Sequence, residues 1–397
     1  MKTLSLPISA FCKTGSGTTP SRNKHDRYYD GDIPWVKSGE LRESVITKTE
    51  ETVTREALAE TPLKIAPKGA VLVAMYGANV GRLGILGIEA TTNQAVCHII
   101  PDQDKADSRY LFHVLRQKLP EFISRSVGGA QPNISQQIIR ETEIPLPPIA
   151  EQKRIAAILD KAEELRGLRR RALEELDAIV QSIFLDMFGD PVSNLKGWKR
   201  TRFSDLLSAI ESGRSPNCLD RPAEGAEWGV LKLGAVTWCE YNPLENKALP
   251  SNETPDLFLE VKPGDLLFTR KNTFELVAAC ALVRSTPPRL LLPDLIFRFR
   301  TKPDAPINLS FLHQLLINSA KRREIQKLAS GSASSMPNIS KAKLESVLIE
   351  VPPLHLQEDF ARRVEAIEQL KAVHRESLAQ LDALFASLQH RAFRGEL

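Results

Sequence analysis

The chain contains 397 residues, too many for one ordinary hydrophobic core, so at least two domains are expected. Its composition, 42% hydrophobic and 26% charged, is typical of a soluble globular protein, and no apolar stretch is long and uninterrupted enough to cross a membrane. The formal net charge of +4 permits a polyanionic partner but does not require one.

The five cysteines are scattered and form no CxxC pair, which argues against a disulfide scaffold or a zinc ribbon and favours a reducing cytoplasm. The N-terminal apolar run is short and is interrupted by Pro7 and Ser9, so it predicts a first strand or turn rather than a signal peptide. The predicted location is therefore cytoplasmic.

The first predicted domain, residues 1–146, shows a mixed α/β pattern. Apolar runs at 70–77 and 96–100 predict buried strands, and the segment 109–119 predicts an amphipathic helix. The turn after the first of these strands carries Tyr76, Asn79 and Arg82 among glycines that permit close approach of another backbone. A loop of small polar residues precedes the sequence PNIS, and the N–H groups of such a loop suit a phosphate backbone.

A long helix is predicted within residues 147–190. Pro147 and Pro148 are tolerated at a helix start, and Glu151 favours the first turn. The helix should end at about Phe188, because Gly189 is a typical helix-terminating residue. About 40 residues at 1.5 Å each make a rod of roughly 60 Å. Such a rod is not stable alone in water and needs a packing partner.

The second predicted domain, residues 191–351, has the same pattern, with strands at 265–272 and 295–300 and short helices within 310–328. The run Arg270–Thr273 ends the first of these strands. Arg and Lys side chains suit guanine edges and phosphates, Asn suits adenine, and Thr suits a thymine methyl group. A second long helix is predicted within residues 352–397, beginning near Leu354 after two prolines.

The sequence PNIS occurs at 132–135 and again at 337–340, 205 positions later. The same offset holds without a gap as far as Phe188 and Phe393, and it superposes Gln152 on Gln357. Upstream the match is weaker and the offset is shorter. The sequence therefore predicts a pseudo-twofold internal repeat of the α/β (α+β) class, in which two mixed globular domains are separated by two long antiparallel helices.

The apolar positions of both helices follow a heptad spacing, which predicts an antiparallel coiled coil. Arg169 and His374 occupy the same seam position, where they either fix the register or extend into solvent beside the seam. The apolar stripe is wider than two helices need, so a partner's helices would cover the rest; alternatively, each helix lies on its own domain. The residues predicted for helix pairing and partner docking are Ile155, Ile158, Leu165, Leu176, Ile179, Ile183, Ile367, Leu370, Leu381, Leu384 and Leu388.

Polar side chains at the ends of strands and in the loops before each PNIS are the predicted DNA-binding set, although any one of them is as easily an ordinary turn residue. In the first domain they are Lys37, Ser38, Tyr76, Asn79, Arg82, Gln131 and Asn133; in the second they are Arg214, Lys232, Arg270, Lys271, Asn272, Thr273, Ser332 and Asn338.

Catalytic motifs are not found. The chain has no Walker loop, no glycine-rich cofactor loop in the required context and no metal-binding histidine pattern. Asp256 and Glu260 superficially suggest a nuclease, but three intervening residues are too few for strand-to-strand geometry, and a surface turn is expected there. We therefore predict no catalytic residues, no metal site and no cofactor.

The segment PLPPIAEQKRIAAILDKAEEL at 145–165 resembles the specificity subunits of type I restriction-modification systems, as do FGDP at 188–191, PWVKSGEL at 34–41 and GDLLFTRKN at 264–272. The start of the second helix, VPPLHLQEDFARR, keeps the glutamine but lacks the sequence EQKRI. The resemblance covers nearly the whole chain.

This resemblance implies a non-catalytic subunit whose two target recognition domains each read one half of a bipartite sequence in double-stranded DNA. It implies that the helices set the unread spacer and dock two methyltransferase subunits, which bind the methyl donor, and that motor-nuclease subunits join them. Two alternatives stay open from the residues alone. One is a coiled-coil DNA-binding or assembly scaffold outside restriction, and the other is the recognition half of an enzyme with an unrecognised active site.

Overall fold

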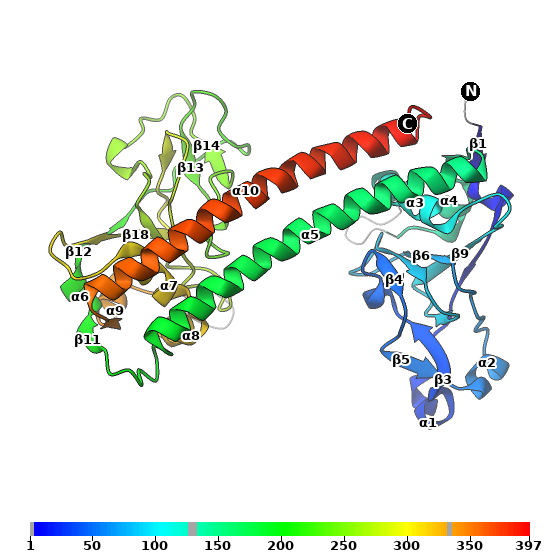
Figure 1. Ribbon diagram of the computed structural model, residues 1–397, viewed down its shortest axis with the longest axis horizontal. Coiled ribbons are helices and arrows are strands. Elements are labelled where there is room, and N and C mark those ends of the chain that lie inside the picture. Colours follow the sequence, from blue (N-terminus) through cyan, green and yellow to red (C-terminus); the bar gives the residue numbers. More distant parts are fainter. Residues whose placement is uncertain (1–3, 126–132, 332–335) are drawn as a thin grey trace. The chain divides into compact units, whose positions relative to one another are not determined.

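Two sheets of unequal size build the first globular part of the chain, and a very similar pair builds the second (Figure 1). The computed structural model describes residues 4–125, 133–331 and 336–397. The chain divides into two units: unit 1 comprises residues 1–170 and 376–397, and unit 2 comprises residues 171–375. Each unit thus contains one globular part and one segment of each long helix.

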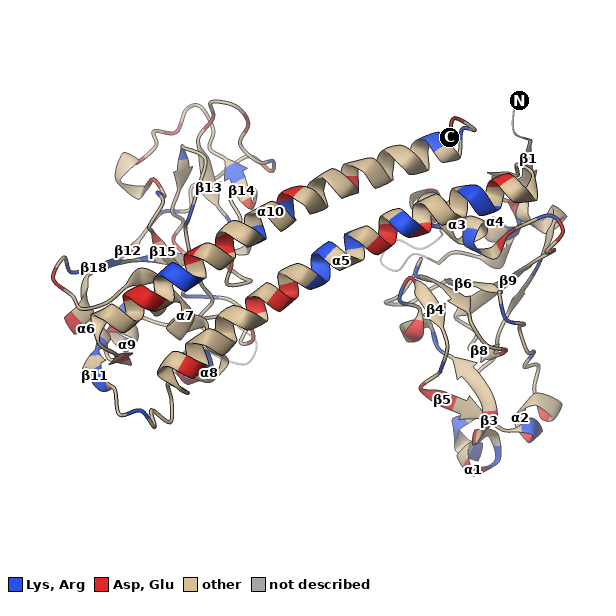
Figure 2. Ribbon diagram, viewed as in Figure 1, with Lys and Arg blue, Asp and Glu red and all other residues tan. Residues whose placement is uncertain are grey.

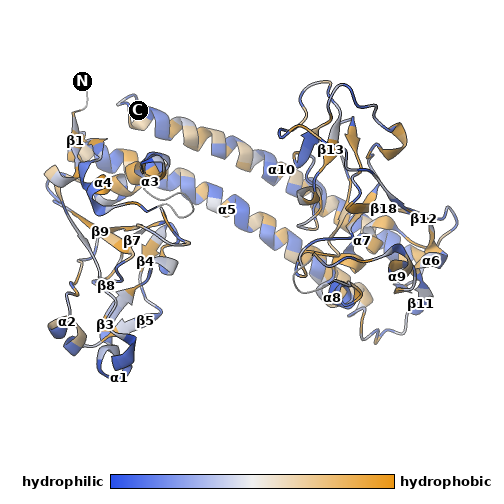
Figure 3. Cartoon of the chain, turned by 180° about the vertical axis from the view of Figure 1, so that it is seen from behind, coloured by the Kyte–Doolittle hydropathy of each residue, from blue (hydrophilic) through white to orange (hydrophobic). Residues whose placement is uncertain are grey.

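In unit 1, the larger sheet has the strand order β2-β9-β6-β7-β4, the smaller has β5-β3-β8, and β1 pairs with β10. The central strands β6 and β7 of the larger sheet are hydrophobic and buried along their whole length (Figure 3). The strands are β1 Ser5–Pro7, β2 Cys12–Ser16, β3 Tyr29–Val36, β4 Ser44–Ile46, β5 Glu51–Val53, β6 Val71–Ala74, β7 Leu83–Leu86, β8 Thr91–Thr92, β9 Val96–Pro101 and β10 Glu143–Pro145; the helices of this part are α1 His25–Tyr28, α2 Arg55–Glu60, α3 Ser108–Ser124 and α4 Gln136–Glu141.

In unit 2, the corresponding orders are β12-β18-β15-β16 and β14-β13-β17, and β11 pairs with β19. The strands are β11 Lys199–Arg202, β12 Leu207–Ser212, β13 Gly229–Leu231, β14 Asn246–Ala248, β15 Leu266–Thr269, β16 Cys280–Leu282, β17 Leu290–Leu291, β18 Ile296–Thr301 and β19 Leu348–Val351; the helices of this part are α6 Phe203–Leu206, α7 Leu309–Ile317, α8 Ser319–Gln326 and α9 Lys341–Glu345.

The strands and helices predicted for the globular parts are confirmed as β6, β9, β15, β18, α3, α7 and α8. The segment 310–328 forms two helices because Asn318 leaves the helical conformation, and its side chain accepts hydrogen bonds from the first N–H groups of α8. The expected turn at Asp256 is a 3₁₀ turn, Leu257–Leu259, with Asp256 as its N-cap.

The two long helices have the predicted extents, α5 from Ile149 to Phe188 and α10 from Leu354 to Ala392. Gly189 follows α5 with a φ of +77°, a conformation that glycine adopts without strain. None of the helices in the described ranges is both long enough and apolar enough to span a bilayer.

Within each unit, the two helical segments contact each other. In unit 1, the guanidinium of Arg166 lies 2.6 Å from the carboxylate of Asp382. In unit 2, the ammonium of Lys371 lies 2.6 Å from the carboxylate of Asp177. Both helical segments also share the hydrophobic core of their globular part, as Phe385 does in unit 1.

The predicted seam is only partly buried. Ile155 is buried in the core of unit 1, whereas Leu165, Ile179, Leu370 and Leu384 are exposed, so the role predicted for these four in helix pairing and partner docking stays a prediction. The cause of their exposure is the width of the apolar stripe, which allows two neighbouring faces to serve as the seam. The remaining predicted positions, Ile158, Leu176, Ile183, Ile367, Leu381 and Leu388, are half-buried.

Candidate nucleic-acid interface

Each PNIS segment anchors the loop that follows a central strand. In unit 1, the N–H of Ile134 donates to the carbonyl of Met75, next to β6, at 2.8 Å. In unit 2, the N–H of Ile339 donates to the carbonyl of Arg270, next to β15, also at 2.8 Å. Both isoleucines are fully buried, and the serine that follows each caps a short helix, α4 or α9. The sequence PNIS therefore holds a surface loop in place.

The loop after β6 brings part of the predicted DNA-binding set of unit 1 together. Asn79 lies beside the 3₁₀ turn Ser38–Glu40, since a Cβ atom on Gly39 would be 3.8 Å from its Nδ2. Tyr76 is half-buried, and burial raises its pKa. Arg82 is exposed. The structure thus brings Asn79 next to the turn that contains Ser38 and leaves Arg82 exposed.

Two predicted lysines are already engaged within their own domains. The Lys37 ammonium lies 2.8 Å from Glu51 and 3.0 Å from Glu50, and hydrogen bonds to these carboxylates raise its pKa. Lys232, which precedes the corresponding turn of unit 2, pairs with Glu245 at 2.8 Å. These pairs close the turns, so neither lysine is primarily a free phosphate contact.

The loop after β15 turns its asparagine inward. Asn272 is only 7% exposed; its Oδ1 accepts from the N–H of Thr273 at 2.9 Å, and its Nδ2 lies 3.4 Å from Thr237 Oγ1. The base contact predicted for Asn272 therefore does not match the direction of its side chain. Thr273 is exposed and Lys271 is half-buried.

The other predicted residues are spread more widely. Arg214 and Asn133 are exposed. The main chain of Asn338 bonds with Ser330 in both directions, while its Oδ1 is buried. Gln131 and Ser332 lie outside the described residues.

Sequence reasoning missed two side chains of α8 that hold the loop after β15. Gln326 and Arg322 donate to its main-chain carbonyls. Polar residues in an amphipathic helix are usually assigned to solvent, so the pattern alone gave no sign of this role.

The helices meet their globular parts through two glutamines. Gln152 accepts from the N–H of Asp107 at 2.9 Å and donates to the carbonyls of Lys105 and Pro147, each at 2.8 Å. Gln357 makes the same three kinds of bond, with Asn308 N–H at 2.9 Å, Pro306 O at 3.0 Å and Pro352 O at 2.7 Å. Both glutamines are fully buried.

The ion pairs between the helical segments are also equivalent under the 205-residue offset. Arg166 corresponds to Lys371, and Asp177 corresponds to Asp382. The pair Arg166–Asp382 in unit 1 is therefore the repeat of the pair Lys371–Asp177 in unit 2. Burial acts to lower the pKa of Lys371, but hydrogen bonds to Asp177 and Glu368 outweigh it, and the pKa is raised. The basic member of each pair, Arg166 or Lys371, lies three residues before the predicted seam position that Arg169 or His374 occupies. Figure 2 shows acidic and basic residues interleaved along both helices.

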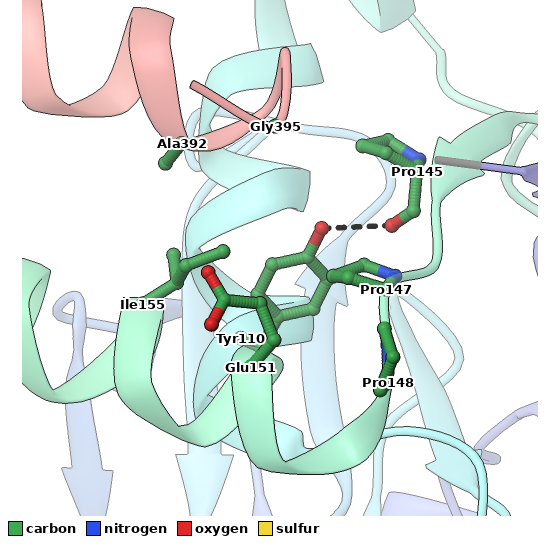
Figure 4. A pocket seen from close by; sticks show the side chains of 8 residues that line it. All are labelled: Tyr110, Pro145, Pro147, Pro148, Glu151, Ile155, Ala392 and Gly395. Atoms are coloured by element: carbon green, nitrogen blue, oxygen red, sulfur yellow. Dashed lines mark hydrogen bonds between the residues drawn. The ribbon is translucent and has the colours of Figure 1, made fainter. Parts of the chain in front are cut away.

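A small cavity of about 170 Å³ lies where α5 begins in unit 1 (Figure 4). The Tyr110 ring lies between Pro147 and Ile155, and its hydroxyl donates to the carbonyl of Pro145 at 2.8 Å. Burial raises the pKa of Tyr110, so it stays a neutral donor. The carboxylate of Glu151 also lines this cavity.

A larger cavity of about 680 Å³ lies in unit 2. Its lining includes His313, whose Nε2 lies 3.1 Å from the carbonyl of Cys280; burial lowers the pKa of His313 to about 4. Lys371 at its edge is paired with Asp177. No nucleophile–base pair is formed by these lining residues.

With this geometry in place, comparison with known proteins is informative. Residues 6–178 match the family model of the type I restriction modification DNA specificity domain. The specificity subunit of the type I restriction enzyme MjaIX from Methanocaldococcus jannaschii is 32% identical over 221 residues, which are 51% of this chain and 50% of that protein. The specificity subunit of EcoKI from Escherichia coli K12 is 24% identical over 417 aligned positions, covering 98% of this chain and 88% of that protein.

Residues 6–178 carry a type I restriction modification DNA specificity domain, and nearly the whole chain is similar to a type I specificity subunit. The crystal structure of the S subunit from M. genitalium superposes with a TM-score of 0.58 at 12% identity, covering 98% of this chain and 96% of that one. The chain therefore shares the mixed α/β fold of that structure. The aligned part spans only half the length of the M. jannaschii relative.

Proposed function

We propose that this chain is the DNA-reading, non-catalytic subunit of a type I restriction-modification complex. Each recognition domain, residues 1–146 and 191–351, reads one half of a bipartite target in double-stranded DNA. The helical segments 147–190 and 352–397 form an antiparallel coiled coil that sets the unread spacer. The complex acts on DNA in the cytoplasm.

The observation that carries this proposal is the duplicated set of contacts. Gln152 and Gln357 join each helix to its domain by the same bonds, and the ion pairs Arg166–Asp382 and Asp177–Lys371 exchange under the same offset. A pseudo-twofold arrangement produces such an exchange, because each patch then meets the counterpart of itself. Two equivalent recognition domains joined to equivalent helical segments fit the binding of a bipartite target. They fit an assembly scaffold or an enzyme with a single active site less well.

The exposed leucines supply a surface for two copies of a methyltransferase subunit. In unit 1 they are Leu165, Leu168 and Leu384; their repeats in unit 2 are Leu370, Val373 and Ile179. Their exposed fractions run from 39% to 63%. Exposed apolar side chains that are grouped on a surface are typical of an interaction site. Within unit 1, the Arg166–Asp382 pair puts Leu384 at nearly the same level along the helices as Leu165. Each unit thus offers a set of exposed aliphatic side chains with the same spacing along the sequence.

Replacing Leu165 and Leu168 together with aspartate is expected to remove one of the two methyltransferase subunits. Charges on a buried docking patch should weaken its binding by about 100-fold or more, while the exposed positions leave the free energy of unfolding nearly unchanged. Native mass spectrometry of the complex would show one bound subunit in place of two.

The matched control is Leu185→Asp. Leu185 is 46% exposed on the same helix, but its repeat is His390, so it lies outside the duplicated patch. Retention of two subunits by the Leu165 and Leu168 double variant would show that docking uses another surface.

The proposed function is tested by the adenine methylation of the genome of the source cell, with and without this gene. The expected result is the loss of one bipartite motif, which gives both half-sites and the spacer. An unchanged methylome in a cell that expresses active methyltransferase partners would contradict the proposal.

A further inference from the structure

The loop between β15 and β16 in unit 2 is held far more firmly than a simple connection requires. The Nε2 of Gln326 donates to the carbonyls of Phe274 at 3.1 Å, Glu275 at 3.2 Å and Val277 at 3.1 Å. An Nη2 of Arg322 lies 3.1–3.3 Å from the carbonyls of residues 275–277. Two side chains of α8 thus fix four consecutive carbonyl groups.

The other side of this loop is fixed as well. Asn272 is held by Thr237 and by the N–H of Thr273, and its own N–H lies 3.4 Å from the carbonyl of Pro337. Lys271 forms a β-bridge with Asn338. A loop that is ordered before binding loses less conformational entropy when a ligand docks, so its exposed side chains can discriminate strongly.

The loop that these hydrogen bonds hold exposes the side chains of Thr273, Phe274 and Glu275. Phe274 is 55% exposed, an unusual position for a phenylalanine. The hydrogen bonds from Arg322 and Gln326 therefore hold a loop that exposes an apolar ring and a carboxylate to solvent. That combination suits a partner with a methyl group and an amino group side by side.

Basic residues flank the tip. The Arg270 guanidinium lies 5.4 Å and the Lys341 ammonium 5.7 Å from the centroid of the Phe297 ring. In the part of the chain that is described, neither of them nor Lys271 forms an ion pair with a carboxylate. This positive charge suits phosphates on either side of a base contact.

We propose that Phe274 and Glu275 read bases in the major groove of the second half-site, and that Asn272 is a positioning residue for them. This inference rests on the proposed DNA-reading function. Phenylalanine can contact a thymine methyl group, and a carboxylate can accept from the N4 amino group of cytosine; both groups are displayed in the major groove. Arg270, Lys271 and Lys341 hold the flanking phosphates.

The test uses the complete subunit in complex with its methyltransferase partners, and the motif methylated or bound by each variant is determined base by base. Phe274→Ala and Glu275→Gln are each expected to reduce the preference for the normal base by about tenfold at one or two positions of one half-site. The other half-site and the spacer should stay unchanged. Leu257→Ala, which alters another exposed apolar side chain of unit 2, should leave the whole motif unchanged.

Asn272→Ala tests the role of the asparagine. Alanine removes both the acceptor for the Thr273 N–H and the contact with Thr237. A positioning role predicts a weaker base preference at the same positions that Phe274→Ala and Glu275→Gln affect, and a loss at a further position would assign base reading to residue 272 itself. The proposal is overturned if Phe274→Ala and Glu275→Gln both keep the normal motif, or if they weaken both half-sites equally. Failure of the proposed function is distinguishable, because the unaltered complex would then select no motif at all.

Discussion

Insertion of seven residues into each long helix is expected to lengthen the spacer of the target by about three base pairs and to leave both half-sites unchanged. Seven helical residues add about 10.5 Å at 1.5 Å each, and one turn of DNA spans about 34–36 Å in about 10–10.5 base pairs. A heptad also changes the rotation of a straight helix by only about 20°. The measurement is the methylated motif of the variant.

The best sites for the two insertions follow from the division of the chain. Repeating residues 171–177 in α5 and 376–382 in α10 places the additions at the boundary of the units, at positions related by the 205-residue offset. The Arg166–Asp382 pair then stays within unit 1 and the Asp177–Lys371 pair within unit 2. An insertion in one helix alone is the control, because both ion pairs cannot then be kept. Methylation of the original spacer by the double variant would disprove the role of the helices in setting it.

Replacement of either buried glutamine by methionine is expected to lower the free energy of unfolding of its unit by about 3 kcal/mol or more. Methionine has a similar size but cannot bond, so Gln152→Met leaves the Asp107 N–H and two carbonyls buried without their partner. Gln357→Met does the same in unit 2. Urea denaturation measures the loss, and hydrogen exchange at the start of α3 or α7 assigns it to a unit.

Gln380→Met provides the control for these variants. Gln380 lies on the exposed side of α10, where its side chain contacts only Glu376 among the described hydrogen bonds. Its replacement should change the free energy of unfolding by no more than about 0.5 kcal/mol. An equal loss of unfolding free energy in all three variants would mean that the buried hydrogen bonds of Gln152 and Gln357 do not stabilise their units.

The extents of the long helices were predictable because their ends carry local signals. Prolines precede both helices, and Gly189 takes up the positive φ that ends α5. The internal repeat also marked Gln152 and Gln357 as equivalent. Most of their hydrogen bonds were not predictable, because one N–H and one carbonyl partner of each glutamine lie about 50 residues upstream and are brought near only by the fold.

The differences between the expected and the observed positions have a common physical cause. Leu165 and Ile179 belong to an apolar stripe that is wider than the seam, and a sequence pattern does not say which edge of such a stripe is covered. Asn272 lies in a polar loop, where its inward direction depends on Thr237, 35 residues away. Gln326 appeared to be a surface residue of α8, although the loop above it buries its amide.

The division of each long helix between two units has a consequence for biosynthesis. The core of unit 1 includes Phe385 and Ala392, while the rest of that core comes from residues before 163. At roughly 5–20 residues per second, a ribosome needs about 10–45 s to extend the chain from the end of the first segment to these last turns of α10. During that time the nascent first domain carries an uncovered apolar groove on α5. Closing a loop of more than 200 residues, such as the one between Arg166 and Asp382, is entropically costly and slow. The newly made chain is therefore exposed to aggregation and proteolysis until the residues around Phe385 and Ala392 have been added.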